Sequence, residues 1–309
     1  HASTSSTVAD IVRVESKIAD IVRVASKIDK VVAVVKELRD EMKQPKVRKY
    51  AHSQMSPKSG FALLKKLKME YVFMRKLPYT IGDQIKADPF EWESIRSSRG
   101  ARNKLYDEQQ RVEYRTYVEQ NIGGVLLDKQ LCVVGVEKGT NLLSVELPEF
   151  NIVLTGCTDL LILSDIVKDQ PGALRALQGV KMLIEVKSTV EDNAQFQAMS
   201  ELIALDALTS KPVIALLTDL VGHWQFFWIS EEDKEHPSFC TVVITDPSTA
   251  FAAIRTLLAH EPSDGEAIMV PSIQKPVKRR KLDQVLPSIS EGGESGGIRE
   301  AMERYSDIA

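Results

Sequence analysis

Short apolar runs separated by polar turns dominate the middle of the chain. They have the length of β-strands and are bounded by Gly, Pro, Asn and Asp residues, which is typical of strand boundaries. The predicted strands are Leu131–Val136, Leu142–Leu147, Asn151–Thr155, Leu160–Leu163, Val180–Val186, Pro212–Thr218, His223–Ile229 and Thr241–Thr245. The run that ends at Thr218 is continuously apolar, so we expect this strand to be buried on both faces of a sheet.

Three segments beside these strands have helical character. Residues 102–120 contain neither Gly nor Pro and are followed by Asn121–Gly124, where we expect the helix to end. Asn193–Leu208 is rich in alanine and has a helical period, and Thr249–Ala259 is the last predicted helix. The order of helix, strands, buried strand, helix and buried strand predicts a mixed α/β core of about 160 residues.

A separate apolar pattern precedes this core and predicts a helix over residues 9–38. Residues 9–18 and 19–28 are near-repeats, and apolar residues recur at spacings of three and four. The seam consists of Ile11, Val14, Ile18, Ile21, Ala25, Ile28, Val32 and Val35. Two interpretations stay open: a coiled-coil helix that binds a partner or a second copy of the chain, and a helix that packs on its own globular domain.

The segment that follows differs in composition from the rest of the chain. Residues 44–60 read as a linker, and residues 41–104 hold 15 Lys and Arg against 6 Asp and Glu. Such an excess of positive charge attracts phosphates without reading sequence. An ordinary solvated surface that happens to be basic explains the same composition.

The tail from Pro262 onward is polar and is broken by proline and by glycine pairs, so we expect it to be disordered. A compact basic run lies inside it. Such a run serves as a nuclear-import signal or as a set of phosphate contacts. We interpret it as an import signal, formed by Lys275, Lys278, Arg279, Arg280 and Lys281.

Composition excludes several classes of protein. No apolar run among the 309 residues approaches the roughly 18 that a membrane-spanning helix needs. Three well-separated cysteines, Cys132, Cys157 and Cys240, exclude a disulfide scaffold and a cysteine-rich zinc module. A net charge of -3 shows that the whole chain is not a polycation. Because it begins at His1 without a methionine, we expect the chain to be part of a longer protein.

Two carboxylates and one amine carry the candidate chemistry. Asp159 and Glu185 each interrupt an apolar run, where a charge is costly unless it is paired or bound to a metal. Glu185 and Lys187 are two residues apart on one predicted strand and therefore project from the same face. If the Asp159 segment lies beside that strand, the two acids can hold Mg²⁺ or Mn²⁺ through oxygen ligands, with Lys187 orienting the attacking water.

This arrangement resembles the PD-(D/E)XK phosphodiesterase superfamily over about residues 105–230. The resemblance rests on Gly156, Asp159 and the sequence Glu185-Val-Lys187, although Thr158 stands where the naming proline of the motif would be. It implies a restriction-endonuclease-like α/β fold, a mixed sheet flanked by helices and here preceded by the long N-terminal helix. It further implies a supporting Gln197 on the following helix, four residues from Glu201, and an acid on the preceding helix, for which we select Glu113.

The organisation predicted from these patterns has four parts: residues 1–40, a coiled-coil-like helix; 41–104, a basic linker and helical segment; 105–260, the nuclease-like domain; and 261–309, the flexible tail. In architecture it resembles the C-terminal portion of Crinkler-type effectors, modular secreted proteins of oomycetes and some fungi. That resemblance implies secretion by a pathogen, entry into the host nucleus and a role in virulence.

Two functions of different classes follow. The first is a Mg²⁺-dependent endonuclease that acts on host nuclear DNA, with DNA preferred over RNA as substrate. The second is a catalytically inactive nuclear effector that binds DNA or a host protein through the basic segment and the N-terminal helix. A purely oligomeric scaffold is a third possibility, in which the acidic cluster has no role.

Overall fold

The structure of the chain is a computed structural model, which describes residues 17, 22–36, 47–78, 85–96, 102–104, 107–233, 236–261, 263 and 265–286. They fall into two units, His1–Val47 and Arg48–Ala309, which we describe separately.

In the first unit, residues 22–36 form a helix whose described side chains are exposed. The remainder of the helix predicted over residues 9–38 lies outside the described residues, apart from residue 17. Association through its apolar seam stays a prediction.

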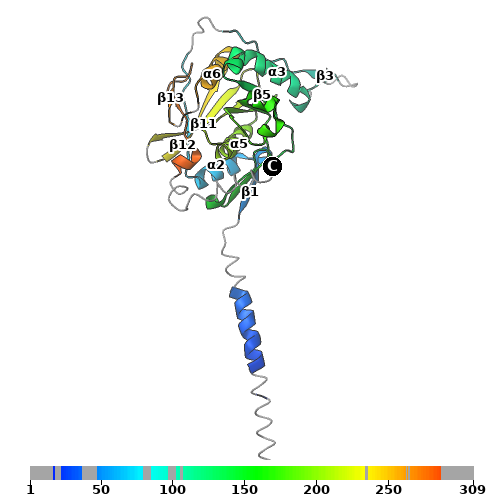
Figure 1. The fold of residues 1–309 in the computed structure, drawn as a ribbon, viewed down its shortest axis with the longest axis vertical. Coiled ribbons are helices and arrows are strands. Elements are labelled where there is room, and N and C mark those ends of the chain that lie inside the picture. Colours follow the sequence, from blue (N-terminus) through cyan, green and yellow to red (C-terminus); the bar gives the residue numbers. More distant parts are fainter. Residues whose placement is uncertain are drawn as a thin grey trace, which may run out of the picture. The chain divides into compact units, whose positions relative to one another are not determined.

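A seven-stranded mixed sheet forms the centre of the second unit (Figure 1). Its order is β2-β12-β11-β10-β9-β8-β5. The strands are β2 (Glu70–Phe73), β5 (Leu131–Gly135), β8 (Leu160–Ser164), β9 (Met182–Val186), β10 (Ile214–Thr218), β11 (Trp224–Asp233) and β12 (His236–Ile244). Pairs β9–β10 and β12–β2 are parallel and the other four pairs are antiparallel. The predicted mixed α/β class is confirmed.

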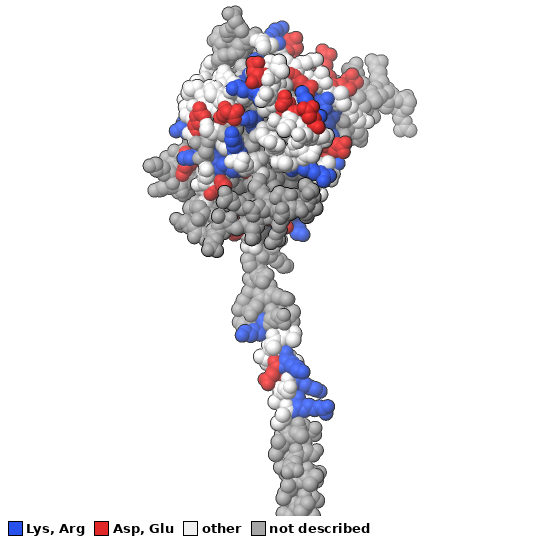
Figure 2. All heavy atoms as spheres, in the orientation of Figure 1, with Lys and Arg blue, Asp and Glu red and all other residues white. Residues whose placement is uncertain are grey.

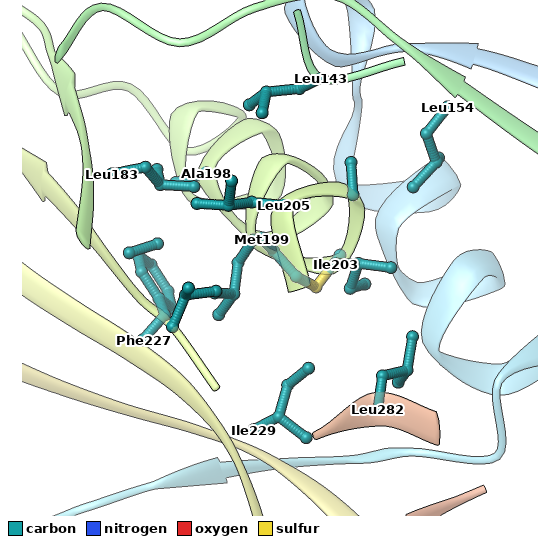
Figure 3. Close-up of a cluster of buried hydrophobic side chains, with 14 of the residues drawn as sticks. Leu143, Leu154, Leu183, Ala198, Met199, Ile203, Leu205, Phe227, Ile229 and Leu282 are labelled. Atoms are coloured by element: carbon teal, nitrogen blue, oxygen red, sulfur yellow. The ribbon is translucent and has the colours of Figure 1, made fainter. Parts of the chain in front are cut away.

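Alternation along the strands gives the sheet two apolar faces. In β9, Leu183 faces one buried cluster while Ile184 and Val186 face the other. Helix α5 (Ala194–Leu208) connects β9 to the parallel β10, and all five residues of β10 are buried, as its apolar run predicted. Figure 3 shows Met199 and Ile203 of this helix among the side chains that fill the first cluster.

Helices and small sheets cover both faces. The layer over the Leu183 face contains α5, α2 (Pro57–Lys66), α7 (Leu282–Val285) and a small sheet of β1 (Arg48–Ala51), β7 (Ile152–Thr155) and β6 (Val145–Leu147). The layer over the Ile184 face contains α3 (Arg111–Ile122), α6 (Pro247–Ala259) and the hairpin of β13 (Ala267–Ile268) and β14 (Val277–Lys278). The result is a three-layer arrangement with the sheet in the middle.

Residues 48–73 are part of this unit, whereas the sequence suggested a linker and a separate basic segment. Strand β1 pairs with β7, and β2 adds an edge strand to the central sheet beside β12. Residues 102–104 form strand β4, paired with β3 (Ser94–Arg96), so the helix predicted from residue 102 begins at Arg111 after a 3-10 turn, Asp107–Gln110. Short edge strands carry little periodic signal, which explains both differences.

The basic run in the tail is folded against the unit, although the sequence predicted disorder. Arg279 and Lys281 are buried, with exposed fractions of 1% and 5%. Lys281 Nζ lies 3.0 Å from Asp206 Oδ2 on α5, and Arg280 Nη2 lies 3.0 Å from Glu231 Oε2 on β11. Burial of Leu282 in the first cluster anchors the segment, which its many polar neighbours concealed in the sequence.

On the face drawn in Figure 2, acidic and basic side chains are interspersed among uncharged ones. Within the described ranges, no helix combines the length and apolar character that are needed to cross a bilayer.

Candidate active site

Strand pairing brings Asp159 and Glu185 together. The antiparallel register of β8 and β9 pairs Leu160 with Ile184, and one further step sets Asp159 opposite Glu185. Cross-strand neighbours of this kind have Cβ atoms about 4.5–5.5 Å apart. Asp159 Oδ2 accepts a hydrogen bond from Val186 N at 2.9 Å, and Asp159 O accepts one from Val136 N at 2.9 Å. The acid at the start of β8 is therefore held by both neighbouring strands.

Glu185 is the centre of the cluster. Lys187 Nζ lies 2.5 Å from Glu185 Oε1, as expected for residues on the same face of one strand. Gln197 Nε2, from the first turns of α5, donates to the same oxygen at 2.6 Å. The structure thus brings together four of the five predicted catalytic residues: Asp159, Glu185, Lys187 and Gln197.

Helix α5 adds a third acid. Gln197 Nε2 also donates to Glu201 Oε1 at 2.8 Å, because the two residues are four apart on one helix face. Glu201 has no exposed surface, and its Oε2 makes no hydrogen bond within the described part of the chain. A buried acid in this state is stable when it is protonated.

Burial and mutual repulsion determine the protonation of the site. Burial, reinforced by the charge of Asp159, raises the pKa of Glu185 to about 7. Burial and the neighbouring Glu185 raise the pKa of Glu201 well above its ordinary value. The pKa of Asp159 is raised by burial and lowered in part by Lys187. Burial would lower the pKa of Lys187, but Glu185 and Asp159 outweigh it and raise that pKa.

These residues fit a divalent metal ion of the magnesium type. The donors are hard carboxylate oxygens, and a divalent cation would relieve the repulsion that raises the pKa of Glu185. Within the described residues, no three His, Cys, Asp or Glu side chains are grouped so that they could enclose a metal by themselves. Mg²⁺ needs no such cage, since it keeps several waters and binds through one or two carboxylates.

Helix α3 contributes residues that sequence reasoning missed. Tyr114 is fully buried, and burial, reinforced by the charges of Asp159 and Glu185, raises the pKa of its hydroxyl. The charge of Arg111, one turn earlier, lowers the pKa of Asp159 in part. Glu113, the predicted acid of this helix, is exposed and lies outside the group that the structure brings together. Helix α3 holds two arginines and two tyrosines, and no pattern in the sequence singles out Arg111 and Tyr114 among them.

A buried histidine supports the cluster from the layer that contains α5. His52 Nδ1 lies 2.9 Å from Ser200 Oγ on α5, and His52 Nε2 lies 3.0 Å from Leu143 O. A Cβ at Gly156, whose φ is +140°, would lie 2.9 Å from the His52 ring. His52 therefore connects the helix that carries Gln197 to the turn that leads into Asp159.

Comparison with known proteins shows what the chain is related to. No family model matches it. It is 49% identical over 267 residues to Crinkler effector protein 63 of Phytophthora sojae (strain P6497), covering 85% of this chain and 59% of that protein. Its homologues are Crinkler effector proteins. Crinkler effector protein 2 of Phytophthora infestans is 48% identical over 261 residues, and Crinkler effector protein 4 of Phytophthora capsici is 46% identical over 261 residues; each alignment covers 84% of this chain.

The chain spans a little over half the length of these Crinkler relatives, 55% of the Phytophthora infestans protein and 59% of the Phytophthora capsici protein. The similarity to Crinkler effectors that the sequence suggested is confirmed over the aligned part. The similarity to PD-(D/E)XK nucleases stays a prediction.

Proposed function

We propose that the unit from Arg48 to Leu286 is a metal-dependent phosphodiesterase that cuts nucleic acid, with DNA preferred over RNA. The observation that supports this most is the convergence of Asp159, Glu185 and Lys187 at the ends of two adjacent strands. A buried cluster with two opposed carboxylates is unfavourable for stability alone, because like charges directly opposite each other destabilise a sheet. Perturbed titratable groups of this kind concentrate at functional sites.

Each residue has a role in this proposal. Asp159 and Glu185 would hold Mg²⁺ or Mn²⁺, which when bound polarises the phosphodiester and lowers the pKa of a bound water. Lys187 orients the attacking water beside Glu185 and stabilises negative charge that develops on the phosphate. Gln197 fixes the rotamer of Glu185 through its 2.6 Å hydrogen bond, and Glu201 fixes Gln197. Neutral Glu201 supports this geometry without adding another negative charge.

A plasmid-nicking assay tests the proposal. Wild-type protein should convert supercoiled plasmid to nicked circles with Mg²⁺ or Mn²⁺ and not with EDTA. Asp159→Asn and Lys187→Ala should each reduce the rate at least a hundredfold with the fold preserved by circular dichroism. Asp169→Asn, at an exposed acid near the end of β8, is the matched control and should cut like wild type. Equal rates for wild type and Asp159→Asn would contradict the proposal.

The names of the relatives support a proposal about where the protein acts. Because the homologues are named effector proteins of Phytophthora, we propose that this chain is part of a secreted pathogen effector that acts in the host. The host nucleus, where DNA is present, is the proposed site of action. Secretion and nuclear entry can be followed with a tagged full-length protein.

The inactive alternative has one observation in its favour. Lys187 and Gln197 both bind Glu185 Oε1, so the cluster already has partners for this oxygen without a metal. A non-enzymatic nuclear binding protein would show DNA affinity that falls steeply with salt, no turnover, and no effect of Asp159→Asn. The same plasmid assay, combined with a DNA-binding titration, separates the two functions.

A further inference from the structure

An exposed group of aromatic side chains lies at the edge of the central sheet, where α2 meets β2. Phe61 of α2 and Phe73 of β2 are 53% and 70% exposed. The ring of Tyr71 contacts both, with centroids 6.4 Å from Phe61 and 4.7 Å from Phe73. Both contacts are edge-to-face, which occupies at most one face of a ring, so a flat ligand can still stack on Phe73. We call Phe61, Tyr71 and Phe73 the aromatic platform.

Strand β2 presents the platform on the same side of the sheet as α5. Tyr71 pairs with Phe239 of the cluster beneath α5, and the two rings stack with centroids 5.9 Å apart. The Tyr71 hydroxyl donates to Gln195 Oε1 in the first turn of α5 at 3.1 Å. Phe73, two residues on, projects from the same face at the edge of the sheet, where it stays exposed. Exposed apolar groups of this kind mark interaction sites.

The platform is connected to the candidate active site through α5. The ring centroids of Phe61 and Phe196 are 5.0 Å apart, and Phe196 precedes Gln197, which binds Glu185. A Cβ at Gly60 would overlap the Phe196 ring, so the missing side chain lets α2 pack against the start of α5. A strand that lies on the platform therefore passes close to the two acids.

Positive charge accompanies the rings. Lys58 and Lys65 are three residues before and four residues after Phe61, so all three share one face of α2. Both lysines are exposed, as is Lys68 after the helix, and no ion pair joins any of them to another described residue. Glu70 is an exposed acid of β2, but it projects from the opposite face of the strand to Tyr71 and Phe73. The platform face thus combines aromatic rings with cations.

We propose that the aromatic platform stacks an unpaired base of single-stranded DNA while Lys58 and Lys65 bind its phosphates. Aromatic rings interleaved with basic side chains are the common means of binding single strands, because every base has a flat face and every nucleotide a negative charge. The inference rests on the proposed function and specifies its substrate, a strand with an unpaired segment beside the cut. An apolar protein partner is the competing occupant.

Fluorescence anisotropy of a labelled oligothymidine strand, in EDTA to prevent cleavage, tests the stacking. Phe73→Ala should weaken binding of the full chain about tenfold, and Phe73→Leu should weaken it as much, because leucine is apolar but has no ring face. Phe73→Trp should keep wild-type affinity. Leu127→Ala, at an exposed apolar residue of α4 (Gly124–Asp128), is the matched control and should bind like wild type.

Salt dependence separates the rings from the lysines. Lys65→Ala should reduce the slope of log K against log salt by about 0.7, whereas Phe73→Ala should leave the slope unchanged. Lys129→Ala, at an exposed lysine that follows α4, should leave both slope and affinity unchanged.

A strand with abasic sites in place of its thymidines isolates the base. This strand keeps its phosphates, so Lys65→Ala should still weaken its binding, but Phe73→Ala should change its affinity by less than about twofold. A blunt duplex should be equally insensitive to Phe73→Ala, since its internal bases are already stacked on their neighbours. Thermal melts followed by circular dichroism should show that all these variants fold like wild type.

The outcomes distinguish this inference from the phosphodiesterase proposal. Wild-type affinity for oligothymidine in Phe73→Ala or in Phe73→Leu would overturn the platform, even where the wild type cuts plasmid. The same result, or a wild type that does not bind oligothymidine, would leave an apolar protein partner as the occupant. If the wild type never cuts plasmid but Phe73→Ala and Phe73→Leu lose affinity for the strand, the phosphodiesterase proposal fails and the platform stands.

Discussion

At the scale of single residues, the buried carboxyl groups of the cluster make the free energy of unfolding depend on pH. Glu185 and Glu201 have pKa values raised above their ordinary value by burial, so the folded state binds more protons than the unfolded chain. Their stabilising contribution is complete at low pH and is lost as pH rises, for Glu185 through about 7. A cation that binds the ionised acids would offset this loss.

Comparison with Glu201→Gln isolates this effect. His52 titrates in the opposite sense, because burial lowers its pKa and its stabilising contribution is lost as pH falls. Taking the difference between wild type and Glu201→Gln cancels His52. The variant, neutral at every pH, should gain about 1–3 kcal/mol in unfolding free energy relative to wild type between pH 5 and pH 8. Urea denaturation in EDTA measures it, and parallel pH profiles for the two proteins would refute the assignment.

The sequence was enough to predict the two acids of the candidate site, but not the residues that pack around them. Asp159 and Glu185 were recognisable because each interrupts an apolar run, where an unpaired charge is costly. Tyr114 and His52 were not, because nothing in the sequence separates Tyr114 from Tyr117 on the same helix, and one histidine in a turn has no periodicity. Glu113 was selected by helix position alone, and position cannot tell which face of α3 meets the sheet.

At the scale of elements, long apolar segments were predictable and short edge elements were not. Helix α5 and strand β10 lie within one or two residues of their predicted bounds. Both segments are rich in apolar residues, which are buried in the folded protein. Strands β1 and β2 are four residues each and lie at sheet edges, so their sequences show little alternation. Strand β13 has only two residues and shows no alternation, and the equally short β14 was hidden by the basic run in which it lies.

The folded basic run provides a stability test. Lys281 Nζ pairs with Asp206 Oδ2 at 3.0 Å and donates to Thr209 O at 2.8 Å, and both charged side chains are buried. Lys281→Met leaves the buried Asp206 charge without its cation and should destabilise the protein by about 3 kcal/mol. Chemical denaturation measures this cost. Lys278→Met, at an exposed lysine of the same run, should change stability by less than about 0.5 kcal/mol; equal costs at both positions would rule out the buried pair as the cause.

Burial of this basic run also affects whether it can serve as the predicted nuclear-import signal. A receptor that reads Lys275–Lys281 as an extended peptide needs side chains that the folded protein buries, namely Arg279 and Lys281. A fluorescent fusion of the isolated segment 271–286 should accumulate in nuclei, and alanine at Lys275, Lys278 and Arg280 should abolish that accumulation. In the full-chain fusion, the same three substitutions should leave the nuclear fraction unchanged. A fall in the full-chain nuclear fraction would show that the folded run is read.

At the scale of the whole molecule, the two units differ in what stabilises them. The unit from Arg48 onward has a seven-stranded sheet with a buried cluster on each face, which is enough apolar core for a domain of its size to fold alone. The helix over residues 22–36 exposes Ile28, Val32 and Val35, and an isolated helix of this length is marginal in water. The homologous alignments, each about 260 residues long, match the size of the larger unit.

Removing residues 1–47 should therefore leave the larger unit intact. We expect the shortened protein to unfold within about 2 °C of the full chain, since no part of the described sheets or their two clusters is deleted. Plasmid nicking should be kept as well, because Asp159, Glu185 and Lys187 all lie in the larger unit. If the apolar seam pairs with a second copy, light scattering should show a dimer for the full chain and a monomer for the shortened one. A large fall in melting temperature would instead mean that the first unit stabilises the second.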